Sequence, residues 1–193
     1  IALQSSVTPG IQTSPNGDRG EFELWRTTNV QPQKQAGYHV VLVKLPQGDI
    51  QEHQFPLLAD IASKYAGGRA RCTQQQNMAF RWVREEALYQ VWKDLKVAGV
   101  AESEVNTITD VTSCPGTDSC KLGITSSMGL GKAIMEELGN MDISDPYVKG
   151  LHIKMSGCPN SCGQHHLANI GFHGASMKGD KGNQLPAYEM FIG

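Results

Sequence analysis

Four of the five cysteines fall into two close pairs, and this spacing limits the possible folds more than any other feature. Five residues separate Cys114 from Cys120, three separate Cys158 from Cys162, and 37 residues lie between the pairs. Thiolates so placed can bind one polynuclear metal centre, because soft anionic sulfur stabilises iron in both of its redox states. The spacing therefore predicts an iron–sulfur site built from two loops that meet in space.

The residues around the cysteines fit this interpretation. Gly116, Gly157 and Gly163 allow backbone geometries in which amide N–H groups approach a cluster, and N–H···S hydrogen bonds tune its reduction potential. Pro115 and Pro159 stiffen the two loops, which lowers the entropy cost of ligation.

Three other interpretations of the cysteines remain open. A structural zinc site usually has about two to four residues between paired ligands, so the five-residue gap fits it poorly. Disulfides need an oxidising compartment, and an odd number of cysteines cannot pair completely within one chain. The third alternative is a set of unconnected core cysteines. Cys72 stands apart on a predicted strand, where we expect it to pack in the interior.

Composition and charge exclude several classes of partner. The 193 residues carry 17 Lys and Arg against 19 Asp and Glu, a net charge of −2, so neither nucleic acid nor an anionic membrane surface is an expected partner. No apolar stretch approaches the roughly 18–20 residues of a membrane helix. The first residues also lack the basic start and apolar stretch of a secretory signal. We expect a globular protein of one large or two small domains.

Composition along the chain predicts three segments. Residues 1–20 are rich in Ser, Thr, Pro and Gly and are interpreted as a flexible arm or linker. Residues 21–100 and 101–193 each alternate between strand-like and helix-like patterns. Because the chain starts without Met, we expect a fragment or a processed product, and because it ends within a predicted strand, we expect the last segment to be truncated at its C-terminus.

The periodicity of residues 21–100 predicts a small α+β sandwich with helices on one face of a sheet. The first expected elements are strands over 22–30 and 38–45 and a helix over 55–65 that is stopped by Gly67 and Gly68. A strand over 69–83 follows, with Met78, Phe80 and Trp82 on one face. The last expected element is a helix with Gly99 as its C-cap and an apolar stripe of Leu88, Val91, Trp92 and Leu95.

Residues 101–193 have a second alternation of elements. The expected elements are a strand over 105–112 that leads into the first cysteine pair, a helix with Leu130, Ile134, Met135 and Leu138 closed by Gly139, a strand over 151–155 that leads into the second pair, and strands over 167–172 and 188–192.

The cysteine segments resemble a known family. SGCPNSCGQHHLANIGFHG (156–174) is similar to the cluster-and-siroheme loop of ferredoxin-type nitrite and sulfite reductases, and TSCPGTDSCKLGI (112–124) is similar to their first cysteine pair. Upstream, residues 28–50 and 69–80 resemble the ferredoxin-like half-domain that precedes these cysteines in the second repeat of those enzymes. The resemblance covers roughly residues 22–193.

This resemblance implies a fold and two cofactors. The expected fold is a ferredoxin-like α/β half-domain followed by a mixed α+β domain that binds a [4Fe–4S] cluster and siroheme. The implied metal ligands are the four paired cysteines, and Cys162 would be the catalytic thiolate shared by the cluster and the siroheme iron. The residues that the resemblance assigns to the siroheme are Ser113, Asn160, Gln76 and Arg71.

Three of these side chains also have a purely structural interpretation. Asn160 is also typical of a turn, Gln76 of a strand-end amide, and Arg71 of a surface charge.

The family resemblance also implies a reaction and partners. The expected function is the multi-electron reduction of nitrite to ammonia, with sulfite reduction to sulfide as the alternative, and a metal-binding or electron-carrier module as the non-enzyme alternative. Partners would be the N-terminal half of the same enzyme, ferredoxin or another electron donor, and a small inorganic anion. Because the basic residues that grip the anion come largely from the missing half, we expect the isolated chain to be inactive. The expected location of the enzyme is the cytoplasm, or the plastid stroma in a eukaryote.

Four further polar residues near the cysteines receive structural interpretations. His165 and His166 are expected to begin a short helical turn packed against the second cysteine loop. Lys121 and Lys154 are expected to be solvated charges, although either could steer an anion or an electron donor.

Overall fold

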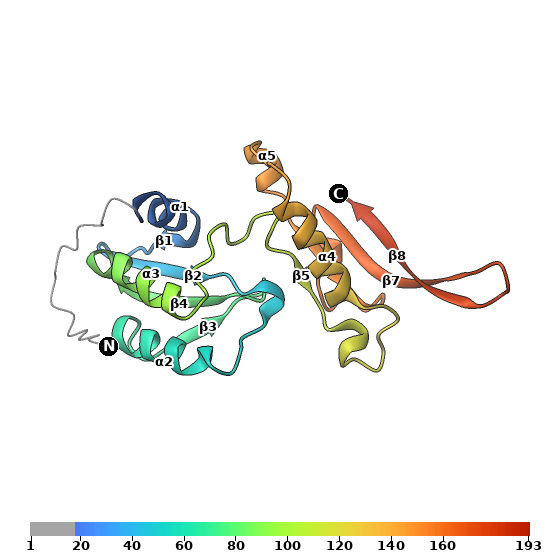
Figure 1. The fold of residues 1–193 in the computed structure, drawn as a ribbon, viewed down its shortest axis with the longest axis horizontal. Coiled ribbons are helices and arrows are strands. Elements are labelled where there is room, and N and C mark those ends of the chain that lie inside the picture. The colour runs from blue at the N-terminus through green and yellow to red at the C-terminus, as the bar shows by residue number, and fades with distance from the viewer. Residues whose placement is uncertain (1–17) are drawn as a thin grey trace. The chain divides into compact units, whose positions relative to one another are not determined.

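The computed structural model describes residues 18–193, which divide into two compact units. The first unit ends at Val105, and the second runs from Asn106 to Gly193. Each contains one four-stranded sheet together with helices (Figure 1). The chain is therefore an α+β protein, which confirms the predicted class.

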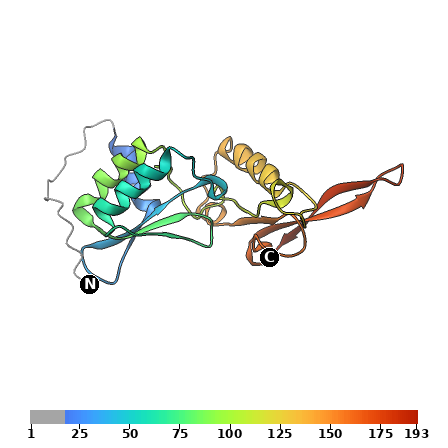
Figure 2. The ribbon, with the colours of Figure 1, turned by 90° about the horizontal axis from the view of Figure 1, so that it is seen from below.

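In the first unit, helices α1, α2 and α3 lie on one face of an antiparallel sheet with strand order β1-β2-β4-β3 (Figure 2). The elements are α1 (Arg19–Asn29), β1 (Val30–Pro32), β2 (Tyr38–Val43), the 3-10 turn η1 (Pro46–Gly48), α2 (Gln54–Tyr65), β3 (Ala70–Cys72), β4 (Met78–Arg84), the 3-10 turn η2 (Glu85–Ala87) and α3 (Leu88–Val97).

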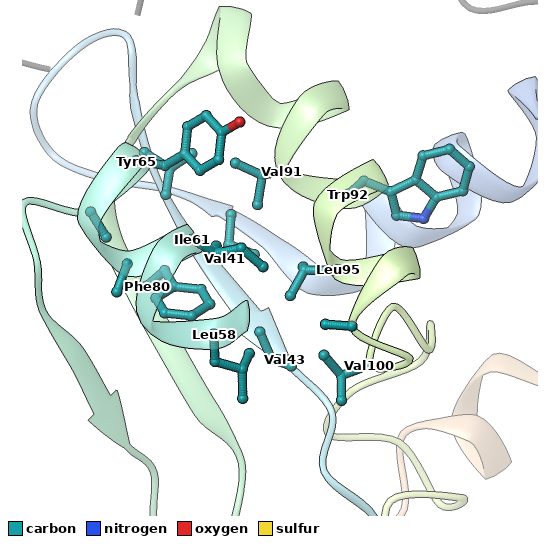
Figure 3. Close-up of a cluster of buried hydrophobic side chains, with 14 of the residues drawn as sticks. Val41, Val43, Leu58, Ile61, Tyr65, Phe80, Val91, Trp92, Leu95 and Val100 are labelled. Atoms are coloured by element: carbon teal, nitrogen blue, oxygen red, sulfur yellow. The ribbon is translucent and has the colours of Figure 1, made fainter. Parts of the chain in front are cut away.

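The predicted apolar stripes form the core of this unit. Figure 3 shows Leu95 of α3 above Val43 of the sheet, with Leu58 of α2 beside Val43, and Trp92 of α3 at the right of the cluster. The whole predicted stripe of α3 is buried, and Gly99 follows the helix with a φ of +70°, a conformation that glycine adopts without strain. Burial of each such side chain contributes about 1.5–3 kcal/mol. The helix predicted over 55–65 and the helix predicted from the stripe of Leu88 to Leu95 are thereby confirmed.

The strand predicted over 22–30 is wrong, because this segment is the helix α1. Phe22 and Trp25 are three residues apart and Asn29 follows four later, a helical spacing that places all three against the rest of the unit. Trp25 is fully buried, and the Asn29 amide donates to the carbonyl oxygens of Leu42 and Glu102 at 3.0 and 2.9 Å. These tertiary contacts outweigh the strand preference of the β-branched residues at the end of the segment.

The strand predicted over 69–83 is a hairpin of β3 and β4 whose second strand contains a bulge. His39 pairs with Val83 but Val41 pairs with Phe80, so β4 has one residue more than β2 between these pairs. Trp82 occupies the bulge with a φ of +65°, and its N–H donates to the side chain of Gln33 at 2.7 Å. The bulge places Val83, and not Trp82, beside Phe80 in the core.

The expectation that Cys72 packs in the interior is also wrong. Cys72 lies at the end of β3, which is the edge strand of its sheet, and all three residues of this strand are exposed. The alternation of the segment predicted a strand but not its position at the edge.

In the second unit the strand order is β5-β6-β7-β8, with β5, β6 and β7 parallel and β8 antiparallel to β7. The elements are β5 (Thr112–Ser113), the 3-10 turn η3 (Gly116–Asp118), α4 (Ser127–Gly139), α5 (Pro146–Lys149), β6 (Ile153–Ser156), the 3-10 turn η4 (His165–Leu167), β7 (Ile170–Lys178) and β8 (Gln184–Ile192).

Helix α4 packs on the sheet of this unit as its apolar spacing predicted. The Ser126 side chain caps the helix by accepting the N–H of Gly129 at 3.2 Å, and the helix ends at Gly139. Its apolar residues contact a small core that includes Ile153 and Met155 of β6. The strand predicted over 151–155 is confirmed, although it begins two residues later.

The strand predicted over 105–112 is wrong except for its last residue. The backbone turns here, because Glu104 and Asn106 adopt left-handed conformations with φ of +64° and +57°. The Asp110 carboxylate accepts the N–H of Asn106 at 2.7 Å, a side-chain contact that stabilises the turn. Ile108 and Val111 are buried in the core without belonging to a strand.

The last two predicted strands exist with different bounds. β7 begins at Ile170, after the turn η4, and continues to Lys178, while β8 begins at Gln184. The residues where the two strands meet are polar, so the apolar pattern did not predict one long hairpin. Within residues 18–193, no helix has the length and apolarity needed to cross a membrane.

Leu95→Ala tests the core of the first unit. Leu95 is fully buried, so the substitution leaves a cavity and is expected to lower the free energy of unfolding by about 2–5 kcal/mol. All three tryptophans lie in the first unit, so urea unfolding followed by tryptophan fluorescence reports on this unit. Val97→Ala, in the same helix but at a residue 77% exposed, should change the value by less than about 0.5 kcal/mol. Equal effects of the two substitutions would contradict the assignment of the core.

Candidate metal centre

The two cysteine loops lie side by side because they follow neighbouring parallel strands. β5 pairs with β6 through Thr112↔Lys154 and Ser113↔Met155, and each strand leads directly into a cysteine loop. Parallel strands end at the same edge of a sheet, so the loops that follow them start close together. The N–H of Cys114 still donates to the Met155 carbonyl at 3.1 Å, which continues the pairing into the first loop.

One backbone N–H of the second loop already points at a cysteine sulfur of the first. Gly157 donates its N–H to Cys114 Sγ at 3.1 Å, the kind of contact predicted for the glycines of these loops. Ser127 donates its hydroxyl to the carbonyl oxygen of Cys114 at 2.7 Å, and its Oγ lies 3.4 Å from Cys114 Sγ. Cys114 and Cys158 are both buried.

The close approach of the loops requires glycine. A Cβ on Gly157 would lie 2.5 Å from Cα of Gly116 and 2.8 Å from the carbonyl oxygen of Thr125. A Cβ on Gly174, in the next strand, would overlap the carbonyl oxygen of Gly157. The carbonyl of Gly157 is also the acceptor for Ile124 N–H and Thr125 N–H, at 2.8 and 3.1 Å. The second cysteine loop is therefore packed between the first cysteine loop and β7 at Gly157.

The other two paired cysteines are exposed. Cys120 follows the turn η3, and its N–H donates to the carbonyl of Gly116 at 3.0 Å. Cys162 lies near the end of the second loop. All five cysteines are free thiols. Across residues 18–193, no group of three or more Cys, His, Asp or Glu side chains converges on one point, so the structure joins the loops but not all four sulfurs.

The four residues that the resemblance assigns to the siroheme are distributed over both units. Ser113 is buried in β5 directly before Cys114, and Asn160 is exposed in the middle of the second loop. Arg71 is exposed in β3, and Gln76 lies in the β3–β4 turn with a φ of +64°. Their role at a siroheme stays a prediction.

Arg71 lines a pocket of about 340 Å³ in the first unit. Arg69, Arg81 and Trp82 also line the pocket, so three arginines and one tryptophan contribute to its wall. The bulge in β4 is the reason why Trp82 reaches this pocket rather than the core. The sequence pattern predicted Arg71 but missed this grouping.

The two histidines after the second loop form the predicted helical turn. The turn η4 places the His165 ring 1% exposed against β6, where its Nδ1 lies 2.9 Å from Ser156 Oγ. Burial, and then the neighbouring His166 and His173, lower the pKa of His165, so its neutral form is favoured. Ser156 was missed by the sequence analysis, although a hydroxyl residue directly before the glycine and cysteine of a loop is a usable signal.

Lys154 is not a solvated charge, which corrects the sequence expectation, whereas Lys121 is exposed as expected. Lys154 lies in β6 and donates from Nζ to the Gln164 side chain at 2.9 Å. Burial lowers the pKa of its ammonium group. β6 lies between β5 and β7 and all four of its residues are buried, so alternation alone placed the charge incorrectly outside.

Most of the first unit matches the model of a known protein family. Residues 31–98 match the model of the nitrite/sulfite reductase ferredoxin-like half domain. The chain is related to the nitrite and sulfite reductases. This relationship confirms the resemblance noted in the cysteine loops and in the half-domain.

Relatives of these kinds match most of the chain. It is 28% identical over 165 residues to a ferredoxin–nitrite reductase of Synechococcus elongatus, which covers 85% of this chain and 31% of the relative. It is 27% identical over 136 residues to an assimilatory-type sulfite reductase of Nitratidesulfovibrio vulgaris, which covers 70% of this chain and 60% of the relative. The chain thus spans about a third of the length of the cyanobacterial reductase.

A solved structure shares the fold. The match to the NirA protein of Mycobacterium tuberculosis covers 86% of this chain and 30% of the NirA chain. Its TM-score is 0.68 and the sequence identity is 20%. The arrangement of the two sheets within their units is therefore shared with a known structure.

The low pKa of His165 predicts how the stability of the second unit depends on pH. An unfolded histidine has a pKa of about 6.5. Below that pH the unfolded chain binds a proton that native His165 does not, so the free energy of unfolding falls as the pH falls. This loss ends once native His165 is protonated as well. Urea unfolding at pH 7.5 and 5.0, followed by NMR signals of β6 and β7, measures it.

Two variants isolate the contribution of His165. His165→Asn keeps a donor near the position of Nδ1 but does not titrate, so the second unit should lose less stability between these pH values. His53→Asn, at an exposed histidine of the first unit, should leave the loss unchanged. An unaltered loss in His165→Asn would show that other groups cause the pH dependence.

Proposed function

We propose that this chain is the cluster-carrying part of a reductase that converts nitrite to ammonia at a siroheme coupled to a [4Fe–4S] cluster. In this proposal residues 21–100 are the ferredoxin-like half-domain, and residues 101–193 are the domain that binds the cluster and one side of the siroheme. The observation that carries it is the juxtaposition of two cysteine loops at the ends of parallel strands, with an N–H···S hydrogen bond between them.

The residues of the site fit an iron–sulfur cluster. The donor set consists of four thiols. Thiolates bind iron more favourably than they bind hard cations. Cys114 and Cys158 supply two buried sulfurs, while Cys120 and Cys162 are exposed, so that a bound group can reach their sulfurs. Gly157 offers an N–H to the sulfur of Cys114, which would stabilise the negative charge of a ligating thiolate.

Cys162 is the proposed shared ligand of cluster and siroheme. Its exposure permits a second group to reach its sulfur, in contrast to the buried Cys114 and Cys158. When bound, the cluster would supply electrons and the siroheme would supply a site for the anion, and the thiolate of Cys162 would add electron density to the metal that it holds. Ser113 and Asn160, next to the cysteines, would orient the siroheme.

The pocket lined by Arg71 supports a role of the first unit in binding an anionic, flat ligand. Siroheme carries several carboxylates, and guanidinium groups bind carboxylates through paired hydrogen bonds. Arg69 and Arg81 would add to Arg71 in this role, with Trp82 as an apolar wall. Gln76, in the adjoining turn, would contribute an amide.

Sulfite reduction is the second candidate. It is supported by the assimilatory-type sulfite reductase among the relatives, whose identity to this chain is within one percentage point of that of the nitrite reductase. We further propose ferredoxin or another electron donor, and the N-terminal half of the same enzyme, as partners in the cytoplasm or plastid stroma.

Iron content and single cysteine variants test the metal centre. Anaerobic reconstitution of the chain with iron and sulfide should yield about four iron atoms per chain with a broad visible absorption. Cys114→Ser, Cys120→Ser, Cys158→Ser and Cys162→Ser should each reduce the iron content severalfold. Cys72→Ser is the matched control, because Cys72 is a free, exposed thiol of the first unit, and it should not change the iron content. Binding of zinc alone would support the metal-binding module instead.

The isolated chain should show no steady-state reduction of nitrite or sulfite, even when loaded with siroheme and cluster. The basic residues that hold the anion are expected in the half that this chain lacks, so the substrate would not be bound. Turnover with a dye as electron donor measures this, with the full-length Synechococcus elongatus ferredoxin–nitrite reductase as positive control. Clear turnover by the chain alone would contradict the proposal that the anion-binding residues lie outside this chain.

A further inference from the structure

The second cysteine loop starts and ends at one buried hydroxyl. Ser156 is the last residue of β6 and is fully buried. Its Oγ accepts the N–H of Gly163 at 3.0 Å, on the far side of the loop that carries Cys158 and Cys162. The same Oγ lies 2.9 Å from Nδ1 of His165. One side chain thereby closes the loop and joins it to the turn that follows.

Packing against neighbouring aromatic side chains holds the His165 ring beside Ser156. Its ring is 1% exposed, and its centroid lies 4.0 Å from that of His166, 5.1 Å from that of His173 and 5.7 Å from that of Phe191. A Cβ on Gly171 would overlap the His165 carbonyl oxygen, so the backbone of the turn sits directly on β7. A ring fixed in this way can in turn fix the hydroxyl that it contacts.

Gly163 also has no freedom to shift toward the strand. A Cβ at this position would overlap the carbonyl oxygen of Met155. The backbone after Cys162 is therefore pressed against β6 and hydrogen-bonded to it at the same place. Cys162 directly precedes this anchored residue, so its backbone position depends on the anchor.

We propose that Ser156, held by His165, is a positioning residue that sets the location of Cys162. The inference rests on the proposed function in one respect, namely that Cys162 is a ligand. Ser156 acts through the backbone of Gly163 and does not touch a cofactor. It keeps the exposed thiol at a defined distance from the loop of Cys114, which lowers the ordering cost of ligation.

The first loop offers a matched control. Ser127 is also fully buried, and it donates to the carbonyl of Cys114 at 2.7 Å. It has the same side chain and the same burial as Ser156, but it acts on the other loop. Ser127→Ala should therefore leave the environment of Cys162 unchanged.

The first experiment uses the chain without cofactors. In Ser156→Ala, amide hydrogen exchange at Gly163, measured by NMR, should become about three- to tenfold faster, because one hydrogen bond is lost. Alkylation of Cys162 by iodoacetamide, measured by mass spectrometry relative to exposed Cys120, should rise about threefold. Ser156→Thr keeps the hydroxyl and should restore both values, and Ser127→Ala should alter neither. Unchanged exchange and alkylation in folded Ser156→Ala would overturn the proposal.

A second variant protects the test against loss of folding. His165→Phe fills the ring volume but removes Nδ1, so it should produce changes at Gly163 and Cys162 in the same direction. If Ser156→Ala unfolds the second unit, this variant decides the outcome by the same two measurements.

The second experiment uses the reconstituted chain. Ser156→Ala should shift the midpoint potential of the cluster and change its electron paramagnetic resonance spectrum, while Ser156→Thr restores both. A cluster with unaltered potential and spectrum in Ser156→Ala would overturn the positioning role. Failure of the wild-type chain to bind iron would instead refute the proposed function, and the first experiment would still decide whether Ser156 sets the position of Cys162.

Discussion

The parallel pairing of β5 and β6 is the interaction on which the candidate site depends. Only two residues of β5 take part, yet they align the ends of two segments that are about forty residues apart in sequence. The hydrogen bonds from Cys114 to Met155 and from Gly157 to Cys114 continue this alignment beyond the strands. Without it, the two cysteine pairs would have no common location.

Glycine makes that alignment sterically possible. Gly116, Gly157 and Gly174 lie where any Cβ would meet backbone atoms of a neighbouring segment. Such packing leaves the loops little room to move, and it turns the backbone N–H of Gly157 toward a sulfur. The same rigidity explains why two buried serines can act on the loops, since a single hydroxyl is effective only against a backbone that is otherwise constrained.

The first unit is organised by a different constraint. Its helices bury two tryptophans, Trp25 and Trp92, against an antiparallel sheet, which supplies a stable scaffold. The bulge in β4 keeps the third tryptophan, Trp82, out of this core and adds it to a pocket rich in arginine. The bulge therefore separates Trp82, which lines the pocket, from Trp25 and Trp92, which stabilise the core.

The sequence by itself determined the elements whose signal is local. Apolar spacing located α2, α3, α4 and β2, and cysteine spacing with adjacent glycines located both loops. The resemblance of these loops to nitrite and sulfite reductases indicated a relationship that the half-domain match and the relatives confirm.

Only the tertiary structure decided the features that depend on distant neighbours. Residues 22–30 became a helix because Trp25 and Asn29 find partners in other elements, and Cys72 is exposed because β3 lies at an edge. The contacts of Ser156, Ser127 and buried Lys154 were likewise not predicted, since the sequence does not name the partner that a polar side chain meets after the chain has folded. Local periodicity records which face a residue prefers, but the contacts that fix a site join residues far apart in sequence.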